Sequence, residues 1–147
     1  MKKFLWGLLV TLLIGALITG CSDKLEESSY IVSGIQEASE NADGGVISLD
    51  AVYDEEEWDT VLLDTAYNIK NALVDLKVKN RSSIGEFLLE DSNQGIVFIR
   101  DHQAVAYAQI STEVFDFAAY YYSYVYETYP KGTVFDPYKR VVVKNKE

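Results

Sequence analysis

Carboxylates are the most frequent side chains in this sequence that could do chemistry, and they are densest in YDEEEWDTVLLDTAY, residues 53–67. A run of acids could chelate a cation or supply the acid and the base of a glycoside hydrolase. On a strand, however, alternate side chains point to opposite faces, so at most half of these acids would converge. We therefore expect no metal site and no catalytic carboxylate pair here, and we interpret the acids as a solvent-facing approach to a buried strand.

Two other patterns lack the spacing that catalysis or metal binding requires. DSNQGI begins like a calcium loop at Asp91, but Gly95 comes one position early and the twelfth position is His102 instead of glutamate. His102 is the only histidine and falls in a predicted turn, and no G-x-S-x-G motif supplies a nucleophile. The chain also lacks the Cys and His sets that bind zinc and a glycine-rich phosphate loop. We expect no catalytic residue, no metal and no cofactor apart from a covalent lipid.

The N-terminal sequence MKKFLWGLLVTLLIGALITGC predicts that lipid. Lys2 and Lys3 precede the uncharged stretch Phe4–Gly20, which is the layout of an export signal, and LITGC resembles a lipobox. The thiol of Cys21 can carry a thioether-linked diacylglycerol, and an additional amide-linked chain such as palmitate would make the hold firm. We expect residues 1–20 to be a signal peptide and Cys21 to be the lipidation site.

Two other interpretations compete with the lipoprotein one. A transmembrane anchor needs about 20 apolar residues, and the uncharged stretch is slightly shorter. A secreted protein with one free thiol would be unusual, and Cys21 is the only cysteine. Because a single cysteine excludes a disulfide within the chain, a hydrophobic core has to stabilise the fold.

Charge is distributed unevenly along the chain. Residues 21–64 contain 13 acidic residues and one basic residue, whereas residues 65–147 contain 10 of each. Nucleic acid and anionic lipid headgroups both require clustered Lys and Arg, so the distribution argues against nucleic acid and against a polybasic hold on the membrane. We expect the lipid to do the anchoring and the acidic segment to keep the protein off the headgroups.

The sequence predicts a tether followed by one folded domain. Residues 21–45 are rich in Ser, Glu and Asp, which favours an acidic flexible tether with at most a short helix over Ile31–Glu40. Residues 46–147 then form a single domain. Its first clear strand is Val61–Leu63, a short apolar run of the kind found inside a sheet. Apolar residues at helical spacing predict a helix over 68–79.

The rest of the chain predicts mostly strands. Residues 84–111 fit three consecutive strands, with IVFIR in a central position and RDHQ as a tight turn. Residues 132–146 fit a closing hairpin, and both prolines are expected in connections. Residues 113–128 fit either a helix or a strand. The expected fold class is α+β, an antiparallel sheet of about four to six strands with one main helix packed on one face.

Aromatic residues suggest where a partner would bind. The tyrosine-rich run Tyr120–Tyr126 offers large, rigid contact area, which protein interfaces and sugar-binding faces favour. The same tyrosines could instead fill the core and cover the sheet. Trp58 and Tyr67 stand at either end of the Val61–Leu63 strand. The candidate binding surface consists of Trp58, Tyr67, Tyr120, Tyr121 and Tyr124.

The order ISLDAVYDEEEWDTVLL…AY resembles a family of small uncharacterised bacterial lipoproteins. The matching positions are Ile47–Leu49, the Trp58-Asp59 pair, the apolar strand and Tyr67, whereas Ala66 stands where that family commonly has proline. GIVFIRDHQAV is similar to the family's strand-turn-strand pair. The resemblance implies a small α+β envelope lipoprotein and brings no known activity with it.

These patterns predict a lipid-anchored protein on the extracytoplasmic side of the cell membrane or the outer membrane. We expect a non-catalytic binding module whose partner is another envelope protein or a surface polymer. The alternative is an immunity or inhibitor-type lipoprotein that neutralises an exported toxin or hydrolase, because an acidic surface would steer a basic enzyme towards it. An enzyme is the third interpretation.

Overall fold

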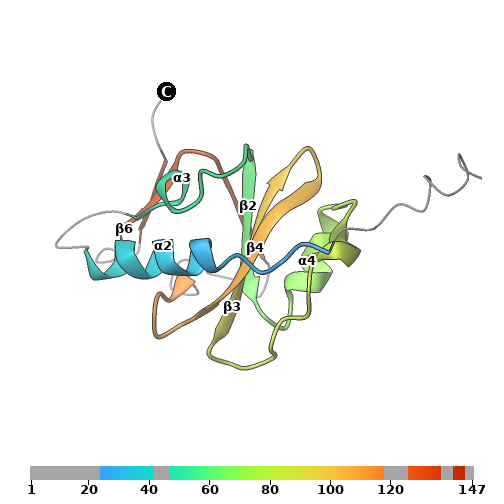
Figure 1. Ribbon diagram of the computed structural model, residues 1–147, viewed down its shortest axis with the longest axis horizontal. Helices are drawn as coiled ribbons and strands as arrows, with labels where there is room; N and C mark the ends of the chain where they lie inside the picture. Colours follow the sequence, from blue (N-terminus) through green and yellow to red (C-terminus); the bar gives the residue numbers. More distant parts are fainter. Residues whose placement is uncertain (1–23, 42–46, 118–125, 137–140, 145–147) are drawn as a thin grey trace, which may run out of the picture.

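The computed structural model describes residues 24–41, 47–117, 126–136 and 141–144, and these form an α+β fold with two antiparallel sheets (Figure 1). The larger sheet has the strand order β4-β3-β2-β5 and the smaller sheet has the order β1-β6-β7. The elements are α2 (Ser29–Glu40), β1 (Ile47–Ser48), α3 (Leu49–Val52), β2 (Thr60–Thr65), α4 (Ile69–Asp75), η1 (Arg81–Ser83), β3 (Asn93–Arg100), β4 (Gln103–Ser111), β5 (Glu127–Pro130), β6 (Thr133–Asp136) and β7 (Val141–Lys144).

The α+β class and the antiparallel pairing are confirmed, but the prediction of a single sheet is wrong. The closing hairpin forms, since β6 pairs with β7, yet it joins β1 instead of extending the larger sheet. β5 is an edge strand that ends in Pro130, a residue that was expected in a connection and has no N–H to donate. At Gly132, with φ 83°, the chain turns into the smaller sheet.

The central strands β2 and β3 are buried on both faces, which explains their nearly continuous apolar sequence. In β2, Val61 and Leu63 belong to one core layer and Leu62 to the other. In β3, Phe98 belongs to the same layer as Val61 and Leu63, and Val97 belongs to the same layer as Leu62. The predicted strand Val61–Leu63 and the central position of IVFIR are therefore both confirmed.

Each face of the larger sheet is covered by a different layer. On one face lie α2, α3 and the smaller sheet, and Phe135 of β6 packs its ring 5.1 Å from that of Tyr129 in β5. On the other face lies α4, which buries Ile69 and Leu73 against Leu62. Figure 1 shows α2 to the left of the larger sheet, the extended segment before α2 crossing in front of that sheet, and α4 to its right.

Helix α4 lies where a helix was predicted, but it ends at Asp75 and not near residue 79. Lys77 adopts the left-handed conformation with φ 56°, and the Val78 N–H donates to the carbonyl of Leu73 at 3.0 Å. This is the Schellman arrangement, which usually has glycine in the left-handed position. The sequence carries no glycine or proline at this point, so nothing in it signalled the end of the helix.

The segment before residue 42 is part of the folded domain. The short helix allowed over Ile31–Glu40 forms as α2, but the prediction of a flexible tether is wrong for residues 24–41. Ile31 and Ile35 of α2 are fully buried in the core. Upstream of α2, the Leu25 N–H donates to the carbonyl of Ser83 and the Ser28 N–H to that of Tyr107, both at 2.9 Å. The second bond covers part of the exposed edge of β4.

We expect Ile35→Ala to lower the free energy of unfolding by about 2–5 kcal/mol, because it leaves a cavity between α2 and the sheet. The matched control is Gln36→Ala, at an exposed position one residue further along α2, which should change stability by no more than about 0.5 kcal/mol. Urea unfolding followed by circular dichroism measures both variants. Equal, negligible effects would show that α2 behaves as a tether in solution.

The first of the three strands predicted over residues 84–111 does not form. Residues 85–90 are irregular, and only Phe87 among them is buried, whereas Leu88 and Leu89 are exposed. The Leu88 N–H donates to the side chain of Gln109 at 2.8 Å, a contact that replaces strand pairing. The other two strands are β3 and β4, and the tight turn between them has Asp101 and His102 in left-handed conformations.

Asp64 of β2 is a carboxylate inside the core, only 4 % exposed. Burial raises the pKa of its carboxyl above the ordinary value of 3.8, and the hydrogen bond from the Thr65 N–H to Oδ1, at 2.7 Å, offsets part of that effect. The fold therefore favours the protonated form of Asp64. The native state consequently binds a proton more tightly at this position than the unfolded chain does.

This linkage predicts that wild type loses stability relative to Asp64→Asn as the pH rises. The loss begins at about pH 4, near the unfolded-state pKa, and is complete once the pH has passed the raised pKa of the folded state. Urea unfolding of both proteins at several pH values between about 4 and 7 measures the difference in unfolding free energy. A difference that stays constant over this range would contradict the raised pKa.

Candidate binding groove between helices α2 and α3

The acidic run Asp54–Glu57 is displayed on the surface by two buried aromatic residues that flank it. Tyr53 and Trp58 pack on the ring of Phe98, with centroids 4.8 and 5.0 Å away. The indole Nε1 of Trp58 donates to the carbonyl of Tyr53 at 3.2 Å and closes the segment as a loop. All four acids between these aromatic residues are exposed. The core thus holds a carboxylate-rich loop in a fixed position above the sheet.

A cavity lies beside this loop, between α2 and α3. The two helices approach closely because Gly34 has no side chain; a Cβ there would lie 3.1 Å from the carbonyl oxygen of Val52. The cavity has a volume of about 430 Å³. The described residues that line it include no Lys or Arg and are Tyr30, Ser33, Gly34, Glu37, Ala38, Asn41, Ser48, Ala51 and Val52.

A hydrogen bond joins the cavity to the acidic loop. The hydroxyl of Tyr30, which is 44 % exposed, donates to Oδ1 of Asp54 at 3.2 Å. The negative charge of Asp54 raises the pKa of this phenol, and Glu55 and Glu37 act in the same direction. One exposed tyrosine at the rim thus contacts Asp54, shares the cavity with Glu37 and lies within the electrostatic influence of Glu55. We call this site, Tyr30 with Glu37, Asp54 and Glu55, the acidic groove.

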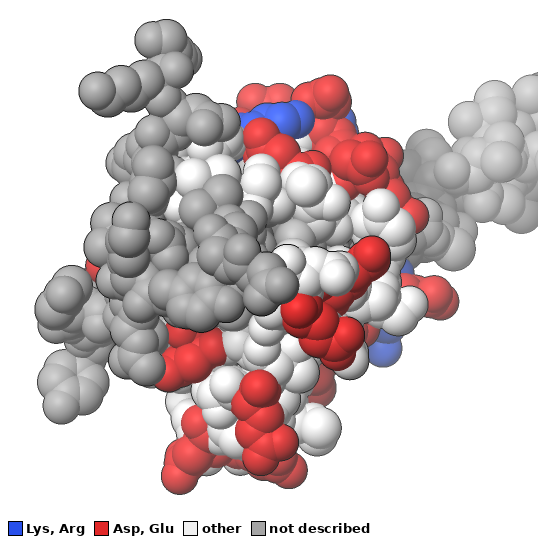
Figure 2. Space-filling model, turned by 90° about the vertical axis from the view of Figure 1, so that its left-hand side faces the viewer, with Lys and Arg blue, Asp and Glu red and all other residues white. Residues whose placement is uncertain are grey.

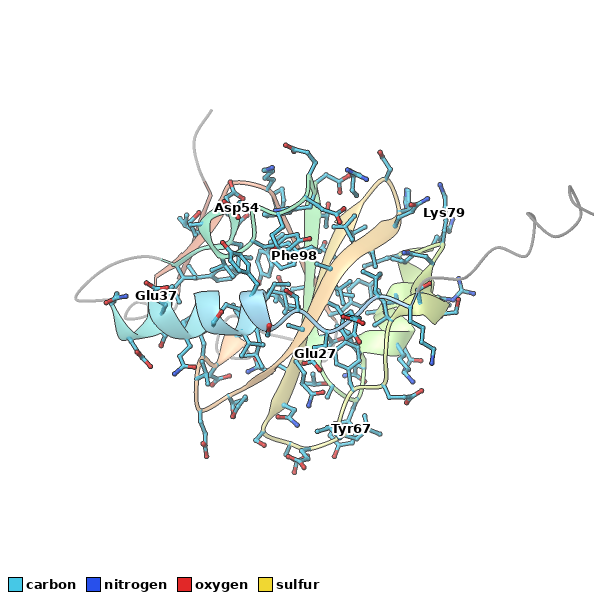
Figure 3. All side chains as sticks on the ribbon, in the orientation of Figure 1. Glu27, Glu37, Asp54, Tyr67, Lys79 and Phe98 are labelled. Carbon is cyan, nitrogen blue, oxygen red and sulfur yellow. The ribbon has the colours of Figure 1, made fainter. Side chains whose placement is uncertain are left out.

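The figures show the setting of the acidic groove. Figure 3 places Glu37 on α2 at the left and Asp54 above it, both on the side opposite to Lys79. Figure 2 views the molecule from that left-hand side, where Asp and Glu predominate over Lys and Arg among the coloured residues. Among the described residues on this side, a cationic group would therefore meet more negative than positive charge.

Most of the aromatic surface predicted from the sequence does not assemble in the described residues. Trp58 is only 3 % exposed and belongs to the core, so its assignment to a binding surface is wrong. Tyr67 is exposed, but its hydroxyl donates to the carbonyl of Leu89, and it lies in Figure 3 far from the acidic groove. Tyr120, Tyr121, Tyr124 and the proposed lipidation site Cys21 lie outside the described residues.

Tyr30 was missed because the signal that marks it is not local. It stands in the segment interpreted as a tether, and its partner Asp54 is 24 residues further along the chain. The one available clue was the spacing of Ile31 and Ile35, one helical turn apart, which gives α2 a buried face and turns Tyr30 outwards.

His102 and a second cavity lie outside the acidic groove. His102 is exposed, and its Nδ1 lies 3.1 Å from the carbonyl of Leu76 with no nucleophile in contact. Within the described ranges, no three His, Cys, Asp or Glu residues are grouped so that they could hold a metal ion. A second cavity of about 350 Å³ lies between α4 and η1, where Lys70 pairs with Glu86 at 2.8 Å and lowers the pKa of that carboxyl.

Comparisons of the chain with protein-family models, curated proteins and solved structures return no match. The resemblance to small bacterial lipoproteins therefore stays a prediction. Among the helices that the structure describes, none is long and apolar enough to cross a membrane.

Proposed function

We propose that this protein is a lipid-anchored, extracytoplasmic binding module whose acidic groove holds a basic segment of a partner protein. The observation that carries the proposal is the bond between Tyr30 and Asp54, which places an exposed aromatic ring among carboxylates at the edge of a cavity. A Lys or Arg side chain that enters the cavity would meet Glu37 and lie against the ring of Tyr30. Such a site needs no catalytic group.

The negative charge of the acidic groove favours one of the two partners expected from the sequence, an envelope protein, over the other, a surface polymer. An anionic surface polymer would be repelled by the Asp54–Glu57 loop, whereas a basic protein segment would be attracted to it. These acids are exposed, so the attraction would act mainly on the association rate and would weaken with added salt. A basic envelope protein is therefore the partner that we propose.

The anchor is the second part of the proposal. Cys21, preceded by LITGC, would carry the lipid, and the resemblance to small α+β lipoproteins supports this location. The described chain begins at Lys24, beside α4 and on the other side of the molecule from the acidic groove (Figure 1). Anchored from that end, the groove would be presented away from the membrane.

The same groove would also serve an immunity or inhibitor-type protein, because an exported toxin or hydrolase with a basic surface fits the same charge. The two functions differ in a deletion strain. An immunity function predicts that deletion sensitises the cell to one particular exported enzyme. If the deletion strain survives exposure to exported toxins and hydrolases as well as wild type does, the immunity function is contradicted. Binding of an envelope protein then stands as the proposed function.

A photo-reactive amino acid placed at Ser33, an exposed residue that lines the cavity, tests the binding function in intact cells. We expect it to capture one envelope protein through a segment rich in Lys or Arg. The same probe at Asn71, exposed on α4 across the sheet, is the matched control and should not capture that protein. Equal capture from both positions, or none from Ser33, would contradict a specific site in the groove.

A further inference from the structure

Positive charge collects at one end of the domain. Five of the seven Lys and Arg residues whose side chains the structure describes belong to the N-terminal segment, to α4, to η1 or to the segment between α4 and η1, and the other two are Arg100 and Lys131. We call the first five the basic surface. It consists of Lys24 in the N-terminal segment, Lys70 and Lys77 on and just after α4, Lys79, and Arg81 in η1.

The backbone around the basic surface is held in place while the charges stay in solvent. Val78 is fully buried, whereas its neighbours Lys77 and Lys79 are exposed. The guanidinium of Arg81 donates to the carbonyl of Val78 at 3.1 Å, and the Lys79 N–H donates to the carbonyl of His102 at 2.8 Å. These contacts fix the segment without using the ammonium groups.

Most of these charges have no counter-ion. The ion pairs within the described ranges involve Lys70, which binds Glu86, and Lys131, which binds Glu57. The other four members of the basic surface form none there. The exposed acids at this end include Glu26, Asp75 and Asp101, the last beside His102, whose carbonyl accepts from the Lys79 N–H. Asp54 lies in Figure 3 on the side opposite to Lys79.

The N-terminal segment joins the domain at the same end. The Leu25 N–H donates to the carbonyl of Ser83, at the end of η1, and the Leu25 side chain packs against the core beneath α4. Only Ser22 and Asp23 separate Cys21 from Lys24. Consecutive Cα atoms are about 3.8 Å apart, so three such steps lead from Lys24 to Cys21 along the chain. A lipid on Cys21 would therefore hold this end against the bilayer.

We propose that the basic surface docks on the anionic phospholipid headgroups of the membrane that carries the protein, and so turns the acidic groove outwards. This proposal rests on the proposed lipid anchor at Cys21. Each Lys or Arg near an anionic membrane surface shifts the docked population by about fivefold, or roughly 1 kcal/mol. The net charge of residues 21–64 argues against such a hold, but α4, η1 and the segment between them bring Lys70, Lys77, Lys79 and Arg81 to one end of the domain, and Asp54 lies in Figure 3 on the side opposite to Lys79.

The test uses the full acylated chain with one free thiol, Ser82→Cys within the basic surface or Glu40→Cys at the far end of α2, both exposed positions. A fluorophore on the thiol reports contact with a quencher carried on lipid headgroups. The vesicles contain either equal parts of phosphatidylcholine and phosphatidylglycerol or phosphatidylcholine alone. We expect strong quenching at residue 82 only on the anionic vesicles, reduced by high salt, and little quenching at residue 40 on either.

A charge-removal variant completes the test. Lys77→Gly combined with Lys79→Gln should reduce the docked population on anionic vesicles by about 25-fold, the product of two fivefold effects. Glycine also suits the left-handed position 77, so this variant should fold normally, as circular dichroism would verify. Lys131→Gln, at an exposed lysine outside the basic surface, is the matched control and should leave quenching unchanged.

The outcomes separate the two proposals. Mass spectrometry of the purified protein shows whether Cys21 is acylated before any vesicle is used. An unacylated chain would contradict the anchor and the docking together. An acylated chain with equal quenching at residues 82 and 40, or with quenching at residue 82 that is independent of vesicle charge, would overturn the docking alone. Preferential capture of an acidic protein over anionic vesicles by the basic surface would overturn it as well.

Discussion

Cys21→Ser is expected to abolish acylation and to leave a longer, slower-migrating precursor on a gel. A hydroxyl cannot form the thioether to diacylglycerol, and without that modification the lipobox is not cleaved. Compared with the mature wild-type protein, the measured mass of the variant should lack the contribution of the acyl chains and include that of residues 1–20. The loss of membrane anchoring should be complete. Stable anchoring needs more than one acyl chain, and without the thiol the diacylglycerol cannot be attached.

The matched control is Ser22→Ala, which changes the next residue and keeps the thiol. It should be acylated and cleaved as wild type is. Mass spectrometry and membrane fractionation measure both variants. If Cys21→Ser keeps the mass and the membrane association of wild type, the protein is not a lipoprotein, and the alternatives of a plain transmembrane anchor or a secreted free thiol return.

Phe98→Ala is expected to have the largest effect on stability. Phe98 is fully buried in the central strand β3, and its ring supports both Tyr53 and Trp58. Removing such a ring costs about 3–5 kcal/mol, a large part of the roughly 5–15 kcal/mol that a domain has in total. Because Tyr53 and Trp58 flank the acidic loop, the loss would also loosen one wall of the acidic groove.

Two variants control this prediction. Phe98→Leu keeps an apolar side chain in the site and should cost less than the alanine substitution. Leu88→Ala changes a side chain that is 66 % exposed and should stay within about 0.5 kcal/mol of wild type. Urea unfolding at one pH measures all three. A loss below about 1 kcal/mol for Phe98→Ala would show that its ring does not support the loop.

The sequence predicted the elements whose signals are local. Strands β2, β3 and β4 follow from apolar runs and a tight turn, and α4 follows from the spacing of Ile69 and Leu73. The end of α4 was misplaced because its stop is a left-handed lysine instead of a glycine. The first of the three strands expected within residues 84–111 does not form, because an apolar run does not show which of its side chains will be exposed.

The errors that matter for function involve contacts between distant segments. The composition of residues 21–45 indicated a tether, whereas two isoleucines suffice to dock α2 on the sheet. The acids of the loop after α3 were visible in the sequence, but their partner Tyr30 became evident only once α2 and α3 were packed together. Counting net charge in each half of the chain likewise did not show that α4, η1 and the segment between them bring four Lys and Arg residues to one end of the domain.

The most direct test of the proposed function is charge reversal in the acidic groove, measured as crosslinking yield from a photo-reactive residue at Ser33 in intact cells. Glu37→Lys with Asp54→Lys should lower the yield by roughly tenfold, because two attractions become repulsions. The matched control, Glu90→Lys with Asp91→Lys, reverses two exposed acids elsewhere and should leave the yield unchanged. Undiminished capture by the groove variant would contradict recognition of a basic partner by this site.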